Sequence, residues 1–348
     1  MTCDFKNVLV TGGAGYIGSH TVRALQSQGF NPIVLDNFVY GHEYIVRDVL
    51  KVPFVTGQLG DRELLENVLS GRHPCCNNQK CIAVIHFAAY AYVGESVISP
   101  QKYYRNNVGD SLVLLEVIHS LSQIDKSNPI PIIFSSTCAT YGIPPDNSKI
   151  SENFPQNPIN PYGRSKLMIE NMIQDFGNAY NMPSVIFRYF NAAGAHPKCD
   201  LGEDHTPETH LIPLVLQTSL GRRPEIHIYG DDYETPDGTC IRDYIHVCDL
   251  ADAHVLGLKK VLHQKEQFVF NLGNGNGTSV QEVIKACELI TGLDIPSRVF
   301  PRRVGDPPVL VSSSENACKQ LGWTPRYPSI EVMIKHAFKW HQNHESIV

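Results

Sequence analysis

The chain has no apolar run near the roughly 18 residues that a membrane-spanning helix needs, so the sequence predicts no membrane segment. It also lacks an excess of basic charge, because 29 lysines and arginines stand against 35 acidic residues, for a formal net charge of −6 at pH 7. A nucleic-acid partner or an anionic membrane surface is therefore not expected. The first residues lead directly into a strand-like run without a signal peptide, and we expect a cytoplasmic protein.

The cysteines and histidines lack the spacing of metal ligands. None of the 10 cysteines forms a Cys-x-x-Cys pair, and none of the 15 histidines belongs to a His-x-x-x-His or His-Glu-x-x-His motif with a third ligand. Cys75, Cys76 and Cys81 stand near His73, and we interpret this stretch as a polar surface insertion that carries reduced thiols. The sequence therefore predicts no metal site.

A glycine-rich turn follows the first strand-like segment. Gly12, Gly15 and Gly18 stand at Gly-x-x-Gly-x-x-Gly spacing between an apolar strand and a helical pattern. Such glycines permit a tight turn, close approach of backbone N–H groups to a pyrophosphate, and close packing of the helix on the strand. A second strand ends about 20 residues later in Asp36, whose carboxylate accepts hydrogen bonds from a ribose diol and repels a 2′-phosphate. The pattern predicts a site for NAD rather than NADP.

Short strands alternate with amphipathic segments over the first half of the chain. The expected strands span residues 7–11, 32–36, 52–56, 82–87, 131–136 and 184–190. This alternation predicts an α/β fold with a doubly wound parallel Rossmann sheet, which binds its ligands at the carboxyl ends of the strands. From about residue 191 the pattern breaks into short pieces, with strands expected at 225–229 and 268–272 and helices near 248–263, 279–291 and 329–342. We expect an NAD-binding Rossmann domain over residues 1–190. Residues 191–348 are expected to form mainly a smaller α/β substrate-binding lobe, with segments that return to the first domain.

Tyr162 and Lys166 stand four residues apart, just after a proline where a helix is expected to begin. Residues at this spacing share one helix face. Because a neighbouring cation favours the phenolate of a tyrosine, we expect Lys166 to bring the pKa of Tyr162 from about 10 toward neutral pH. Thr137, at the end of an expected strand, is predicted to donate a hydrogen bond to a substrate oxygen or to the phenol. These three side chains suit acid–base chemistry on a hydroxyl or a carbonyl, although an isolated Tyr-x-x-x-Lys motif is more often a contact on a solvated helix face.

Several long motifs resemble one family over nearly the whole chain, namely the UDP-sugar 4-epimerases of the extended short-chain dehydrogenase/reductases. The motifs lie at residues 10–20, 93–96, 161–166, 188–191, 194–197, 237–239, 242–246, 249–252, 270–273 and 301–306. The resemblance implies an isomerase that holds NAD tightly, transfers hydride from C4 of the sugar and returns it to the other face of a 4-keto intermediate. It also implies a homodimer, formed through two helices of the first domain.

The resemblance assigns roles to individual residues. Tyr162 is implied to exchange the proton of the C4 hydroxyl, Lys166 to lower the pKa of Tyr162 and bind the nicotinamide ribose, and Thr137 to orient the hydroxyl. The implied cofactor contacts are Gly12, Gly15, Tyr16, Ile17, Gly18, Asp36, Asn37, Gln58, Leu59, Phe87, Ala88, Ala89, Ala91, Asn106, Tyr162, Lys166 and Phe190. The implied UDP-sugar contacts are Thr137, Tyr162, Asn191, His210, Leu211, Tyr229, Arg242, Arg303 and Asp306.

The chain departs from the family pattern at several of these positions. Gln58 replaces an acid beside the adenine, Ala91 replaces a lysine near the NAD pyrophosphate, and His210 stands where an asparagine is common. Leu310 replaces a tyrosine that restricts the sugar pocket in some relatives, so a 2-acetamido group is expected to fit. UDP-glucose/UDP-galactose epimerisation is the first expectation. The alternatives are UDP-N-acetylglucosamine or UDP-xylose/UDP-arabinose 4-epimerisation and, in a different class, a non-catalytic NAD-binding regulator.

Overall fold

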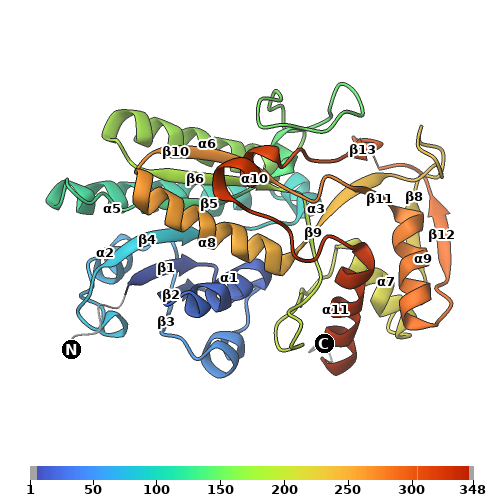
Figure 1. Cartoon of the computed structure of the whole chain (residues 1–348), viewed down its shortest axis with the longest axis horizontal. Helices are drawn as coiled ribbons and strands as arrows, with labels where there is room; N and C mark the ends of the chain where they lie inside the picture. Colours follow the sequence, from blue (N-terminus) through green and yellow to red (C-terminus); the bar gives the residue numbers. More distant parts are fainter. Residues whose placement is uncertain (1–5, 304, 345–348) are drawn as a thin grey trace.

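The computed structural model describes residues 6–303 and 305–344. A seven-stranded parallel sheet lies at its centre, in the order β10-β6-β5-β4-β1-β2-β3 (Figure 1). Its strands are β1 (Asn7–Thr11), β2 (Asn31–Asp36), β3 (Phe54–Thr56), β4 (Cys81–His86), β5 (Ile132–Thr137), β6 (Ser184–Tyr189) and β10 (Gln267–Leu272). The strand order reverses beside β1, which places a binding crevice at the carboxyl ends of β1 and β4.

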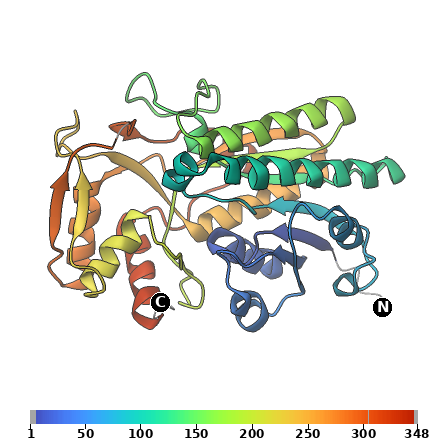
Figure 2. The same cartoon turned by 180° about the vertical axis from the view of Figure 1, so that it is seen from behind.

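Helices cover both faces of this sheet. On one face α1 (Tyr16–Ser27) and α8 (Val247–Gln264) pack together, and Val8 and Val10 of β1 point into the core beneath them. Leu9 points to the opposite core, under α2 (Arg62–Leu69), α5 (Asp110–Ile124) and α6 (Pro161–Tyr180). In Figure 2, which views the molecule from behind, α5 and α6 lie in front of the sheet. Because both faces are buried, the strands are continuously apolar rather than alternating.

A smaller group of elements adjoins the sheet. Its strands are β7 (Asn191–Ala193), β9 (Ile241–His246), β11 (Gly277–Ser279) and β13 (Val309–Leu310), together with the separate pair β8 (Ile226–Tyr229) and β12 (Ser297–Phe300). The helices α7 (Leu211–Ser219), α9 (Val280–Thr291) and α11 (Ile330–Asn343) pack on one another around a core that includes Ile212, Ile284 and Ile334. The remaining elements are α3 (Val93–Ile98), α4 (Pro100–Tyr103), α10 (Glu315–Leu321) and four short helical turns at Ile45–Leu50, Pro74–Cys76, Tyr104–Gly109 and Cys138–Thr140.

The predicted fold class is confirmed. Strand β10 belongs to the large sheet and helix α8 packs on it, although both follow residue 191 in the chain. The domain boundary at residue 190 stays a prediction. The interpretation of Cys75–Cys81 as a polar surface insertion is wrong for two of its thiols. Cys76 is 0% exposed, with its thiol directed to the carbonyl of Val68, and Cys81 begins the central strand β4. Both cysteines are therefore small core residues.

Candidate active site

The glycine turn between β1 and α1 has the geometry of a dinucleotide loop. Gly12 has φ of +70°, and a Cβ atom there would lie 2.6 Å from the backbone nitrogen of Ala88. A Cβ atom on Gly18 would lie 2.2 Å from the carbonyl oxygen of Gly12, so only glycine lets α1 begin this close to the strand. Gly15 is the N-cap of α1, and no side chain caps this helix end. The first N–H groups of α1 therefore suit a phosphate.

Asp36 ends β2 beside this turn and is 8% exposed. Its Oδ2 accepts a hydrogen bond from the backbone nitrogen of Ala14 at 3.0 Å, and its Oδ1 accepts one from Phe38 at 2.9 Å. Burial raises the pKa of Asp36, while these backbone donors act in the opposite direction. Each carboxylate oxygen keeps a further lone pair, so Asp36 fits the ribose diol of NAD.

The other predicted cofactor residues follow the carboxyl ends of neighbouring strands. The side chain of Asn37 donates to Gln58 Oε1 at 3.1 Å, which joins the segments after β2 and β3. The backbone nitrogen of Ala88 donates to Thr11 at 3.1 Å, so the segment after β4 lies against the glycine turn. The hydroxyl of Tyr16 donates to the carbonyl of Gly194 at 2.6 Å. Ile17 lies in α1, and Asn106 lies in the helical turn Tyr104–Gly109 before α5. Segments that follow strands of the large sheet contain Leu59, Phe87, Ala89, Ala91 and Phe190.

Thr137 ends β5, and Tyr162 and Lys166 lie in the first two turns of α6. Pro161 opens α6, and the side chain of Asn160 caps it by accepting from Gly163 at 2.8 Å. A Cβ atom on Gly163 would lie 2.6 Å from the carbonyl oxygen of Ala139, so glycine allows the first turn of α6 to approach the segment after Thr137. The Thr137 hydroxyl lowers the pKa of the Tyr162 phenol.

The electrostatics of Tyr162 differ from the sequence prediction. Burial is the largest influence and raises the pKa of Tyr162, and the neighbouring Tyr189 acts in the same direction. Lys166 is 3% exposed, and burial lowers its pKa to about 7. Its amino group donates to the carbonyl of Ser135 at 2.8 Å. The expected lowering of the Tyr162 pKa by Lys166 is therefore wrong for this structure, because the lysine is buried against a strand carbonyl and its own charged form is disfavoured.

Sequence reasoning missed the residues that hold this trio. The hydroxyls of Ser135 and Tyr189 hydrogen-bond to each other. The amide of Asn107 donates to Ser165 Oγ at 3.1 Å, which ties α6 to the segment before α5. Buried polar pairs of this kind are satisfied only by tertiary contacts. No local spacing signals them.

The structure brings the predicted substrate residues together in pairs. Arg242 of β9 and Asp306 form an ion pair at 2.5 Å, with side chains 13% and 28% exposed. The guanidinium carbon of Arg303 lies 3.9 Å from the centroid of the Tyr229 ring. Asn191 begins β7, next to β9 in the sheet.

His210 and Leu211 stand at the start of α7, where the His210 ring is directed to Glu203 rather than to either arginine. Leu310 pairs with Arg242 across β13 and β9 and packs against a cluster of Cys138, Tyr141, Ile150 and Phe190. The position predicted to control sugar size therefore adjoins both the residue after Thr137 and one predicted substrate arginine.

Comparison with known proteins identifies the family. Residues 8–273 match the model described as the NAD dependent epimerase/dehydratase family. The chain belongs to this family. The match includes the glycine turn, Thr137, Tyr162 and Lys166, whereas Arg303 and Asp306 lie beyond it.

Named members of the epimerase/dehydratase family match this chain over nearly its full length. UDP-glucose 4-epimerase of Halalkalibacterium halodurans is 49% identical over 339 residues, which are 97% of this chain and 96% of the relative. UDP-glucose 4-epimerase of Lacticaseibacillus casei is 45% identical over 97% of each chain. The crystal structure of UDP-glucose 4-epimerase from Brucella ovis in complex with NAD matches with a TM-score of 0.88 and 46% identity, over 96% of this chain and 97% of that chain. Among residues 6–303 and 305–344, no helix has the length and apolar character to cross a membrane.

Proposed function

We propose that this chain catalyses the reversible 4-epimerisation of UDP-sugars, interconverting UDP-glucose and UDP-galactose with tightly bound NAD. The observation that carries the proposal is that Thr137, at the end of β5, and Tyr162 and Lys166, at the start of α6, accompany a glycine turn that fits NAD at the end of β1 in the same parallel sheet. The high identity to UDP-glucose 4-epimerases over 97% of the chain supports the same reaction. The proposal keeps the predicted site residues in the roles that the family resemblance implies.

Each residue of the trio has a distinct task in this proposal. Bound NAD supplies reversible acceptance of the hydride from C4 of the sugar. Tyr162 accepts the proton of the C4 hydroxyl and later returns it to the C4 oxygen, so proton and hydride both end on the sugar and no net oxidation occurs. Thr137 orients that hydroxyl. Burial disfavours the Tyr162 phenolate and the Thr137 hydroxyl acts against this effect, while Lys166 binds the nicotinamide ribose.

The nucleotide of the substrate is held by the two residue pairs of the smaller group of elements. A guanidinium binds phosphate oxygens with planar, bidentate geometry, so Arg242 and Arg303 suit the pyrophosphate. Asp306 orients Arg242 and accepts from a ribose hydroxyl. Tyr229 supports the face of the Arg303 guanidinium.

Replacing Arg303 by Met is expected to raise KM for UDP-galactose about 10- to 100-fold with little change in kcat, because a charged hydrogen bond contributes roughly 1.5–3 kcal/mol to binding. Steady-state kinetics measure both constants. Arg302→Met is the matched control, since Arg302 is the preceding residue and pairs with Asp232 at 2.7 Å instead. An equal rise in KM for both variants, or a loss confined to kcat, contradicts the assigned role of Arg303.

The proposed reaction is tested by incubating the purified chain, without added cofactor, with UDP-galactose, UDP-N-acetylgalactosamine and UDP-xylose in separate reactions. Chromatography that separates the C4 epimers is expected to show fastest conversion of UDP-galactose. Preferred conversion of the acetamido or pentose substrate assigns the corresponding alternative epimerase. Absence of conversion of all three substrates, even with NAD added, refutes the proposal and favours the non-catalytic regulator.

A homodimeric enzyme of the cytoplasm is part of the same proposal. Large apolar side chains are exposed on the two helices expected to form the dimer, with Leu112 and Ile124 on α5 and Met168 on α6 at 38%, 82% and 44% exposure. Two copies of this face bury these side chains against each other. Light scattering of the purified protein measures its molar mass, and a monomer at micromolar concentration contradicts the dimer.

A further inference from the structure

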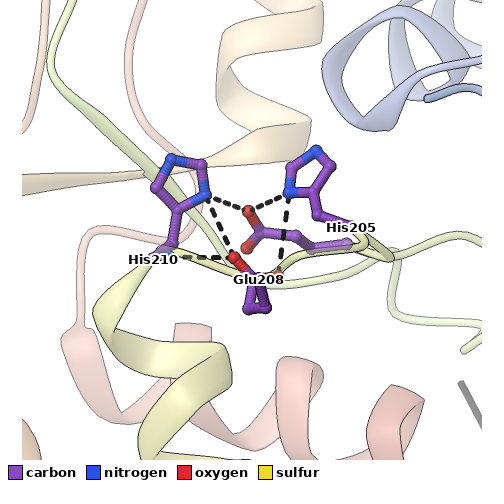
Figure 3. Close-up of side chains that lie close together, drawn as sticks. His205, Glu208 and His210 are labelled. Carbon is purple, nitrogen blue, oxygen red and sulfur yellow. Dashed lines mark hydrogen bonds and ion pairs between the residues drawn. The ribbon is translucent and has the colours of Figure 1, made fainter. Parts of the chain in front are cut away.

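Four potential metal ligands gather between β7 and α7, in a segment to which the sequence assigned no metal. We propose that Glu203, His205, Glu208 and His210 bind one divalent transition-metal ion of the zinc class. Each of the four offers one ligand atom, and these atoms all lie within 4.8 Å of one another. Figure 3 shows the two imidazole rings approaching from opposite sides, each with one ring nitrogen directed at the carboxylates.

The separations between the ligand atoms match those around a single ion. His205 Nδ1 lies 3.2 Å from Glu203 Oε1 and 3.7 Å from Glu208 Oε2, and His210 Nδ1 lies 3.7 Å from Glu208 Oε1. In a tetrahedral zinc site with metal–ligand distances of about 2.0–2.2 Å, neighbouring ligands stand about 3.3–3.6 Å apart. His210 Nδ1 and Glu203 Oε1 are in direct contact. Small side-chain shifts are therefore enough to surround one ion with two nitrogens and two oxygens.

The hydrogen bonding of His205 independently points to a missing partner. Its Nδ1 atom is buried and has no hydrogen-bond partner, although two carboxylates face it. A metal ion binds an imidazole nitrogen only after that nitrogen loses its proton, and His205 Nδ1 is directed at the centre that the two carboxylates share. Oε1 of Glu208 already accepts from the backbone nitrogens of Thr209 and His210 at 2.7 and 2.8 Å. These bonds fix the orientation of the Glu208 carboxylate, as supporting hydrogen bonds do in metal sites.

The charge of the cluster also favours a divalent cation. The side chains of Glu203 and Glu208 are each 4% exposed. In the described part of the chain, the ion-pair partners of these two carboxylates are His205 and His210, and neither Lys nor Arg is paired with them. Two buried carboxylates side by side cost several kcal/mol unless they are compensated. One divalent ion compensates both carboxylates when it takes the place of the protons on the two histidines.

The position of the cluster gives such an ion a consequence for the proposed reaction. His210 stands at the N-cap of α7 with a side chain 53% exposed, and its Nδ1 atom points into the cluster. Coordination through Nδ1 leaves Nε2–H as a donor for a substrate phosphate. This consequence rests on the proposed function, whereas metal binding itself does not.

The proposal is tested on the full chain after treatment with EDTA and removal of the chelator. Titration with Co²⁺, followed by visible absorption, and with Zn²⁺, followed by calorimetry, is expected to show one equivalent bound. The cobalt spectrum is expected to be that of a tetrahedral nitrogen–oxygen site without a thiolate charge-transfer band. His205→Gln and Glu208→Gln are each expected to weaken binding at least about tenfold, the scale on which metal sites respond to lost interactions. His73→Gln, beside the thiol of Cys75, is the matched control and is expected to bind as the unmodified chain does.

Three results overturn the proposal. The first is the absence of saturable one-to-one binding by the unmodified chain, which leaves the cluster as an ion-pair network of carboxylates and protonated histidines. The second is equal affinity in His205→Gln and the unmodified chain. The third is a thiolate band in the cobalt spectrum that is lost in His73→Gln, which places the ion at the cysteine segment instead. Circular dichroism and NAD content of each variant report folding. UDP-galactose conversion is measured separately, so failure of metal binding and failure of the proposed reaction are distinguishable.

Discussion

Replacing Tyr162 by Phe is expected to lower the turnover of UDP-galactose by about 10²- to 10⁴-fold, the usual contribution of a positioned acid–base group, while NAD stays bound. The phenol meets Thr137 at the end of β5 and lies in the first turn of α6, so the substitution removes the proton acceptor and leaves the packing of the ring. Single-turnover kinetics and the NAD content after denaturation measure the two effects separately.

Tyr180→Phe is the matched control for this substitution. Tyr180 lies at the other end of α6 and is 47% exposed, so the loss of its hydroxyl is expected to leave turnover unchanged. Turnover of Tyr162→Phe within a factor of about three of the unmodified chain assigns the proton to another group. Loss of NAD from this variant contradicts the assignment in a different way, because it makes Tyr162 a cofactor anchor rather than a base.

The parts of the molecule that the sequence predicted well are those governed by local rules. Gly12, Gly15 and Gly18 require a specific backbone geometry, and their spacing alone indicates the turn. The alternation of apolar strands with amphipathic helices is also local, and it predicted the parallel sheet. The third strand begins at Phe54 rather than at residue 52, a shift of the size that strand ends commonly show.

Features that depend on burial could not be predicted from spacing. The i, i+4 relation of Tyr162 and Lys166 is correct, but the sequence does not reveal that Lys166 is buried against the carbonyl of Ser135. Burial therefore reversed the expected direction of the Tyr162 pKa. His205 and His210 are five residues apart and match no standard metal motif, so their convergence on two carboxylates emerged only from the folded segment.

The buried ion pair of Glu170 and Arg188 carries the largest expected effect on stability. Arg188 Nη2 lies 2.7 Å from Glu170 Oε2, and the two side chains are 5% and 0% exposed. The guanidinium also donates to the Tyr141 hydroxyl at 3.0 Å and to Gln156 Oε1 at 2.9 Å, and the Ser136 hydroxyl donates to Glu170. The network therefore fixes α6 to β5 directly behind the candidate active site. No sequence signal marks it, because its hydrogen-bonded partners are 14 residues or more apart in the chain.

Arg188→Met is expected to destabilise the protein by about 3–5 kcal/mol, because removal of the cation leaves Glu170 charged and buried without compensation. For a chain of this size the midpoint of thermal unfolding is expected to fall by on the order of 10 °C, measured at equal NAD content. Arg164 is an exposed arginine of α6, the helix that carries Glu170, and Arg164→Met is the matched control that is expected to change the midpoint little.

Adding Glu170→Gln to Arg188→Met separates the charge from the packing of the network. The amide keeps the shape of the carboxylate but carries no charge, so the double variant is expected to recover part of the lost stability, as buried pairs do when both charges are removed. A double variant no more stable than Arg188→Met attributes the loss to the other hydrogen bonds of the guanidinium. Turnover is measured on both variants, because Ser136 immediately precedes Thr137 and Glu170 lies one turn beyond Lys166. If the double variant regains stability but turns over more slowly than the unmodified chain, the ion pair also positions the proposed catalytic side chains.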